Sequence, residues 1–149
     1  MVDISLLLAR LTLGLFVMLS GWTKIYHLGV AKFVDGPFLK LVPGWLPEGL
    51  ARPYGYAVPW LEFLAGLVVS LGLFTRYSAG VLTLVMVSIF IAVVTANGIQ
   101  GGEEKAAFHP SLIYASMAFV LAIVGAGRLS LDALYQGGGG SEGGGRGKK

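Results

Sequence analysis

The chain of 149 residues has no cysteine, which excludes a disulfide framework, a thiolate nucleophile and a cysteine-ligated zinc or iron–sulfur centre. Charge is also scarce, because only 13% of the residues are Asp, Glu, Lys or Arg. The formal net charge of +3 gives no strong footprint for nucleic acid, so we expect no nucleic-acid partner. A chain with so few charges cannot coat a soluble domain of this size.

Hydrophobic residues are abundant instead, at 55% of the chain with a mean hydropathy of +0.75. An apolar helix of about 20 residues spans the hydrocarbon layer of a bilayer, and four runs approach that length. The sequence therefore predicts an all-α fold, an antiparallel bundle of four transmembrane helices in a lipid bilayer. The expected spans are residues 4–26, 56–74, 78–96 and 110–126, within a membrane domain of residues 1–136.

Two segments fall outside these spans. Residues 27–55 form a long first connection that mixes prolines, aromatic residues and lysines, which predicts short interfacial helical pieces broken after Gly36-Pro37. Residues 137–149, "GGGGSEGGGRGKK", predict a flexible tail. We favour a native tail whose basic residues reach anionic lipid over an artificial linker.

The first apolar run could instead be a cleaved signal peptide, but it has no basic leading region, and Arg10 lies within it. Basic residues are balanced between the two expected faces of the membrane, so the positive-inside rule does not decide the orientation. We expect cytoplasmic termini, because Arg10 lies on that side and Glu103 and Glu104 lie on the other.

The first expected helix carries its charges and glycines on one face. Arg10, Gly14, Val17, Gly21 and Lys24 follow steps of four and three residues, which is the spacing of one helix face. Small residues on such a face let two helices approach closely in lipid.

The second helix repeats this pattern with Glu62, Gly66, Val69, Leu73 and Arg76. We expect the two faces to meet. In antiparallel helices Lys24 and Glu62 then lie roughly 3 and 9 Å below the same membrane face, within reach of a lysine side chain. The sequence predicts a Lys24–Glu62 pair in the bundle interior.

A second charge cluster is expected near the opposite face, where Asp132 can neutralise one or two arginines. Its members are Arg10, Arg76, Arg128 and Asp132. An ion pair that only fixes helix register would explain either cluster, and so would a role in proton or ligand handling, since ionisable groups inside a bilayer are costly.

The expected topology also brings both histidines to the face that holds Lys24. We therefore predict a polar pocket formed by Lys24, Glu62, Trp60, His109 and His27, with a quinone head group as its candidate ligand. Two imidazoles at one level could ligate haem or copper, but neither lies within a span, so no metal site is expected. Catalytic residues are not identifiable, because no Ser-His-acid spacing can be recognised.

Three motifs together resemble the DoxX family of small four-helix bacterial membrane proteins. They are "ARLTLGLFVMLSGWTKI" (9–25), "LEFLAGLVVSLGLFTRYSAG" (61–80) and "GAGRLSLDAL" (125–134). The resemblance covers residues 4–134 and leaves the long first connection and the tail unexplained.

One branch of this family is similar to the membrane subunit of thiosulfate:quinone oxidoreductase. The resemblance implies a membrane subunit of a quinone-linked electron-transfer assembly, with a protein partner in the membrane. The alternative is an accessory subunit that packs against a larger complex without redox chemistry of its own. A transporter is disfavoured, because neither inverted repeats nor matching broken helices are recognisable.

Overall fold

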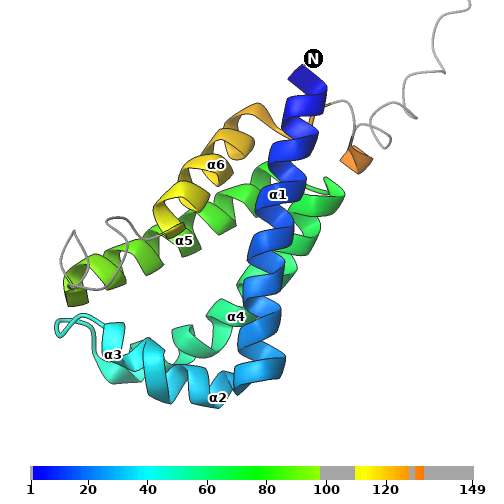
Figure 1. Ribbon diagram of the computed structural model, residues 1–149. Coiled ribbons are helices and arrows are strands. Elements are labelled where there is room, and N and C mark those ends of the chain that lie inside the picture. The colour runs from blue at the N-terminus through cyan, green and yellow to red at the C-terminus, as the bar shows by residue number, and fades with distance from the viewer. Residues whose placement is uncertain (1, 98–109, 128–129, 133–149) are drawn as a thin grey trace, which may run out of the picture.

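The computed structural model describes residues 2–97, 110–127 and 130–132, and every regular element in this part of the chain is helical (Figure 1). Three stretches are long and apolar enough to cross a membrane: Asp3–Leu41, Glu48–Leu71 and Thr75–Ala96. A fourth helix, α6 (Pro110–Val124), is apolar and shorter, with 15 residues. The prediction of an all-helical protein with four apolar helices is therefore confirmed.

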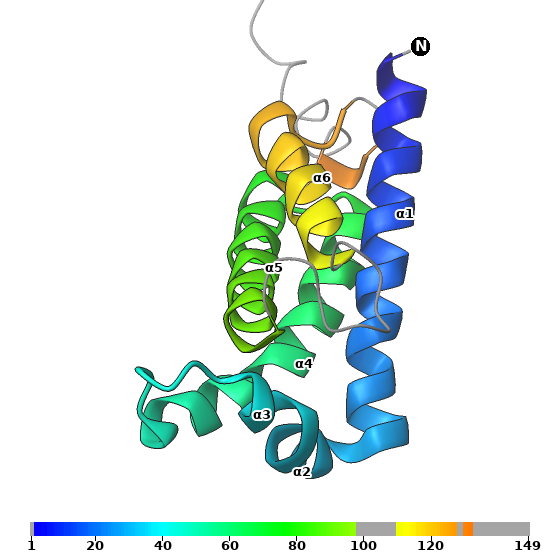
Figure 2. The same ribbon diagram turned by 60° about the vertical axis from the view of Figure 1, so that its left-hand side comes forward.

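Helix α1 (Val2–Trp22) continues into a run of short helical elements at one end of the molecule. These elements are η1 (Thr23–Gly29), α2 (Val30–Phe33), η2 (Val34–Phe38) and α3 (Leu39–Leu41), where η marks a π-helical turn. The chain changes direction at Gly29, whose φ of 83° lies in the left-handed region. The segment α2–α3 then turns away from the axis of α1 (Figures 1 and 2).

The predicted break after Gly36-Pro37 is wrong, because the chain stays helical through Pro37 to Leu41. Proline removes one amide donor and crowds the preceding turn of an α-helix. The wider π-helical turn of η2 contains Pro37, and such turns interrupt the regular α-helical ladder without ending the helix.

The remaining helices form the body of the bundle. Helix α4 (Glu48–Leu71) packs against α1 and α5 (Thr75–Asn97), and α5 packs against α6. Helix α4 begins at Glu48, well before the expected span at residue 56. It ends at Gly72, whose φ of 71° lets the amides of Gly72 and Leu73 bond to Val69 and Val68.

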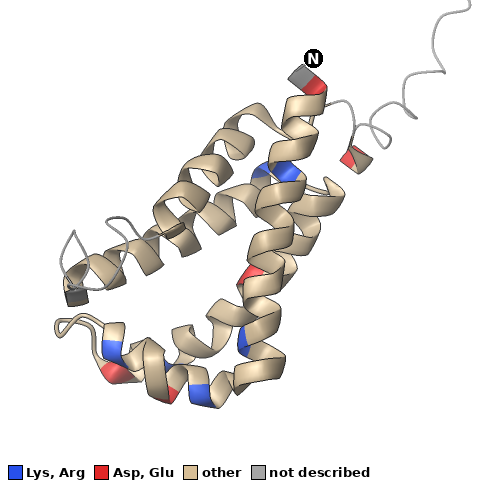
Figure 3. Cartoon of the chain, viewed as in Figure 1, with Lys and Arg blue, Asp and Glu red and all other residues tan. Residues whose placement is uncertain are grey.

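Charged side chains are sparse over the long middle parts of the helices and more frequent in the α2–α3 region (Figure 3). Large apolar side chains cover the outside of α1, α5 and α6, including Phe16, Leu84 and Phe119, each more than half exposed. A surface of this kind fits a lipid environment, where outward-facing apolar groups carry no cost.

Candidate functional site

Three glycines bring the backbones of α1 and α4 into direct contact. A Cβ atom on Gly66 would lie 2.6 Å from the backbone nitrogen of Met18 and 2.7 Å from the carbonyl oxygen of Gly14. A Cβ atom on Gly21 would lie 2.6 Å from the carbonyl oxygen of Pro59. No side chain larger than hydrogen fits at these positions without moving a helix, so the glycines fix the separation of α1 and α4.

This close approach places Lys24 against Glu62. The Lys24 Nζ atom lies 2.7 Å from Oε1 and 2.6 Å from Oε2 of Glu62, so the ammonium donates to both carboxylate oxygens. The Ser20 hydroxyl donates a longer bond of 3.4 Å to Oε2. The Glu62 side chain is 2% exposed and that of Lys24 is 22% exposed. The carboxylate is therefore shielded from the surroundings of the pair, and the ammonium is in part accessible.

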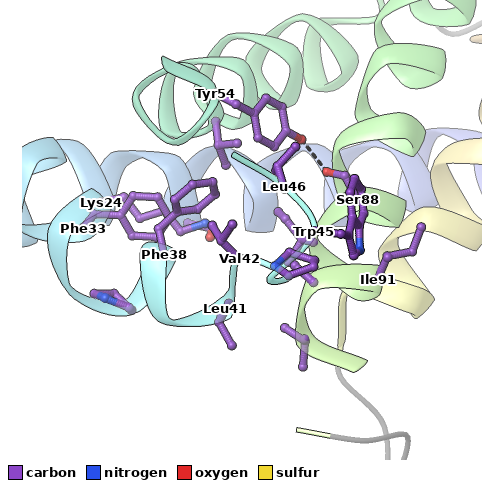
Figure 4. Close-up of a pocket in the computed structure, with 17 residues that line it drawn as sticks. Lys24, Phe33, Phe38, Leu41, Val42, Trp45, Leu46, Tyr54, Ser88 and Ile91 are labelled. Atoms are coloured by element: carbon purple, nitrogen blue, oxygen red, sulfur yellow. Dashed lines mark hydrogen bonds between the residues drawn. The ribbon is translucent and has the colours of Figure 1, made fainter. Parts of the chain in front are cut away.

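Lys24 also borders a cavity of about 500 Å³ between the end of α1, the α2–α3 segment, the first half of α4 and the second half of α5 (Figure 4). Its walls are mostly apolar and aromatic. We call this cavity the Lys24 pocket; the side chains used below are Ser20, Lys24, Phe33, Phe38, Trp45, Tyr54, Ser88 and Ala92.

Aromatic rings form one wall of the pocket. The ring of Phe33 lies 5.2 Å from Lys24 Nζ, at a distance where the ring face attracts the ammonium. Phe38 contacts both Phe33 and Tyr54, with ring centroids 5.7 and 6.2 Å apart. A Cβ atom on Gly55 would collide with the Phe38 ring, so the absence of a side chain at position 55 lets η2 pack directly on α4.

A second polar group lies in the wall, away from Lys24. Tyr54 and Ser88 are hydrogen-bonded to each other across the pocket wall, from α4 to α5 (Figure 4). The Ser88 hydroxyl donates to the carbonyl oxygen of Val85 at 2.7 Å, so the proton of the Tyr54–Ser88 bond comes from the tyrosine. The pocket thus presents hydroxyls from Ser20, Tyr54 and Ser88 and one ammonium among apolar walls.

The predicted pocket and the observed one share Lys24, with Glu62 directly behind it. His27 is exposed and Trp60 is 48% exposed, and neither lines the cavity. His109 lies outside the described residues. As a functional site, the predicted set stays a prediction.

The sequence analysis missed Tyr54 and the aromatic wall. Tyr54, Val58 and Glu62 are spaced by four residues, which is the pattern of one helix face. That pattern was hidden because residues 48–55 were assigned to the connection, although they form the first turns of α4.

At the opposite end of the bundle, Asp132 holds the turn between α4 and α5. Its carboxylate accepts hydrogen bonds from the amides of Phe74 at 2.8 Å and Thr75 at 3.0 Å, which cap the start of α5. Its own amide donates to the carbonyl oxygen of Gly72 at 3.0 Å. The sequence predicted Asp132 as a partner for arginines and did not predict these hydrogen bonds to the backbone.

The arginines of this cluster differ from one another. Arg10 is buried, donates to the carbonyl oxygen of Ala126 at 2.7 Å and is attracted electrostatically by Asp132. Arg76 is exposed, and Arg128 lies outside the described residues. Arg10 therefore connects α1 to the segment after α6.

The family model named DoxX matches residues 5–96, which is more than half of the chain. The chain belongs to the DoxX family. The matched region of this DoxX protein contains both charged faces, with Arg10, Lys24, Glu62 and Arg76, and all residues that line the Lys24 pocket. The motif at residues 125–134 lies beyond it.

Neither the curated proteins nor the solved structures gave a match to this DoxX chain. Family membership and its apolar helices identify it as a membrane protein.

Proposed function

We propose that this DoxX protein is a membrane subunit of a bacterial electron-transfer assembly and binds a quinone in the Lys24 pocket. The observation that carries the proposal is a cavity of about 500 Å³ with aromatic walls and one ammonium group. Cavities of this size commonly hold small apolar molecules that a few polar groups orient.

The residues of the pocket fit a quinone. Phe33, Phe38 and Tyr54 offer ring faces for a flat head group, and the apolar remainder of the wall suits an attached tail. An ammonium carries three N–H groups, of which Glu62 takes two, so Lys24 can donate to a carbonyl oxygen of the ligand.

Glu62 supports proton exchange in this proposal. A quinone would supply the electron and proton acceptor, and Glu62 would hold or release a proton behind Lys24. The carboxylate is nearly fully buried and contacts the ammonium directly, so in this proposal a proton would move between Glu62 and the pocket by way of Lys24.

The proposed setting is the bacterial inner membrane, with four antiparallel spans and cytoplasmic termini. The antiparallel arrangement is supported by the order of contacts between α1 and α4: Gly14 meets Gly66 and Ser70, whereas Gly21 meets Pro59 and Phe63. The α2–α3 segment, with its aromatic and basic residues, would lie in the headgroup region. A protein partner in the membrane would supply the electron donor.

The test compares two variants that add the same phenyl ring. Ala92 lines the pocket, and Ala57 is exposed on α4 and does not line it. The protein is purified from its native membrane in mild detergent, extracted with solvent and examined for the ultraviolet spectrum of a quinone. We expect bound quinone in the wild type and in Ala57→Phe, and little in Ala92→Phe.

Absence of quinone from the wild type, together with migration in a large complex, would refute quinone binding. It would favour the accessory subunit without redox chemistry. Equal quinone in all three proteins would place the ligand outside the Lys24 pocket.

A further inference from the structure

We infer that Glu62 determines the specificity of the Lys24 pocket, because it cancels the charge of Lys24 and so selects neutral ligands over anionic lipids. This inference rests on the proposed function, since it concerns the class of ligand that the same pocket accepts. It adds a role for Glu62 that is separate from proton exchange.

The first support is the charge balance of the pocket. Among the described residues that line it, Lys24 carries the single charge. An unpaired ammonium between apolar walls would attract carboxylates, sulfonates and phosphates strongly, since a charge interaction strengthens where water is scarce. A bilayer contains many such anions with apolar tails, so a cationic pocket would fill with them.

The second support is the geometry of the pair. Both carboxylate oxygens of Glu62 lie within 2.7 Å of Lys24 Nζ, so the two charges neutralise each other at close range. The carboxylate itself does not line the cavity, and its side chain is 2% exposed. A ligand therefore contacts the ammonium, and the balancing negative charge stands behind it.

With the ammonium at the cavity and the carboxylate behind it, the pocket favours a neutral hydrogen-bond acceptor as its ligand. A carbonyl oxygen can take the N–H group of Lys24 that Glu62 leaves, without disturbing the ion pair. An anion would have to compete with Glu62 for the ammonium and would leave one negative charge uncompensated in an apolar site, which is costly. Ser20, Tyr54 and Ser88 add neutral hydroxyls to the wall and no further positive charge.

The experiment uses two competitors that share a tail and sulfonyl oxygens and differ in charge. Decanesulfonate stays anionic at every working pH, and decyl methyl sulfone is neutral. The full chain in nanodiscs of zwitterionic lipid is loaded with a decyl-tailed benzoquinone, whose binding is followed by quenching of tryptophan fluorescence. Each competitor is then titrated against the bound quinone, at concentrations corrected for its partition into the bilayer.

In the wild type we expect the sulfone to displace the quinone at a concentration at least about tenfold lower than the sulfonate. In Glu62→Gln the uncompensated Lys24 should bind the sulfonate at least about tenfold more tightly than the wild type does. Glu48→Gln is the matched control, because it removes the same charge from an exposed carboxylate that does not line the pocket. In this variant the sulfone should still displace the quinone at a lower concentration than the sulfonate.

A second variant keeps the test decisive if Glu62→Gln does not fold. Ser20 is exposed and lines the pocket, so Ser20→Lys adds one positive charge; it removes the long Ser20 bond to Glu62 but neither partner of the Lys24–Glu62 pair. This variant should also gain sulfonate affinity.

If the wild type binds quinone but shows no preference for the sulfone, the inference about Glu62 is overturned, and the proposal that the Lys24 pocket binds quinone is unaffected. Unchanged sulfonate affinity in folded Glu62→Gln, or in Ser20→Lys, would overturn it as well. If the wild type binds no quinone at all, the proposed function fails and the inference fails with it.

Discussion

Lys24 and Glu62 place two opposite charges in a part of the chain that is otherwise apolar. A charge left without its partner in such surroundings is expensive, and removing one member of a buried pair usually costs more than removing both. The pair therefore stabilises the contact of α1 with α4 by avoiding that penalty.

Replacing Lys24 by methionine should lower the free energy of unfolding by about 3 kcal/mol, because Glu62 would lose the ammonium that compensates its buried carboxylate. The double variant Lys24→Met/Glu62→Gln should recover most of that loss. Unfolding in mixed micelles, followed by circular dichroism, gives both values.

Arg52→Met is the control for this prediction. Arg52 pairs with Asp35 and Glu48 through exposed side chains, so its loss should destabilise the protein much less than the loss of Lys24 does. Equal losses in Lys24→Met and Arg52→Met would contradict a special role for burial in the Lys24–Glu62 pair.

At the scale of single residues, the Lys24–Glu62 contact could be anticipated from the sequence because both positions follow a helical period and have similar depths. The positions of His27 and Trp60 could not. Both are close in sequence to Lys24 and Glu62, but the direction of an exposed side chain depends on packing that the periodicity does not encode.

At the scale of helices, glycine sets how closely α1 and α4 approach. A methyl group on Gly66 would collide with backbone atoms of Met18 and Gly14, and backbone cannot move as a flexible side chain can. Gly80, on α5, has no neighbouring atom within 4 Å of an added Cβ atom. The two positions form a matched pair for the same substitution.

Gly66→Ala should destabilise the protein by about 1–3 kcal/mol, because the added methyl group overpacks the α1–α4 contact. Gly80→Ala should be neutral or stabilising by up to about 1 kcal/mol, since alanine favours helix more than glycine does. The comparison is made by unfolding in mixed micelles. A Gly66→Ala protein as stable as Gly80→Ala would contradict the close approach of α1 and α4.

Asp132 makes a separate prediction for the start of α5. Its carboxylate bonds the amides of Phe74 and Thr75, so Asp132→Ala should cost about 1 kcal/mol and speed hydrogen exchange at these two amides. Asp35→Ala serves as the control, because Asp35 is exposed and pairs with Arg52. Unchanged exchange at Phe74 and Thr75 in Asp132→Ala would refute the capping contact.

The ends of the helices were the feature of the fold that the sequence predicted least well. Apolar length revealed four helices, but Pro53 and the other prolines of residues 27–55 made the region before residue 56 resemble a connection, whereas Pro53 lies inside α4. Pro53 lies near the start of that helix, where the missing amide costs little. The extension of α4 back to Glu48 brings Tyr54 to the pocket.

At the scale of the whole molecule, the α2–α3 segment encloses the Lys24 pocket at one end of the helical bundle. It returns from α1 and contacts α4 and α5, so the pocket wall is closed by residues from the first connection. Composition predicted the bilayer and the helical fold. It did not predict this enclosure, which depends on the bend at Gly29 and the packing of Phe38 on Gly55.

The most direct test of the central claim is photo-crosslinking with a decyl-tailed quinone that carries a photoreactive group on its ring, followed by mass spectrometry of the labelled peptides. The account predicts label at pocket-lining residues within the ranges 33–58 and 88–93, such as Phe38, Trp45 and Tyr54, and its loss in Ala92→Phe but not in Ala57→Phe. Label spread over exposed apolar positions such as Phe16 and Phe119, with no change in Ala92→Phe, would contradict it.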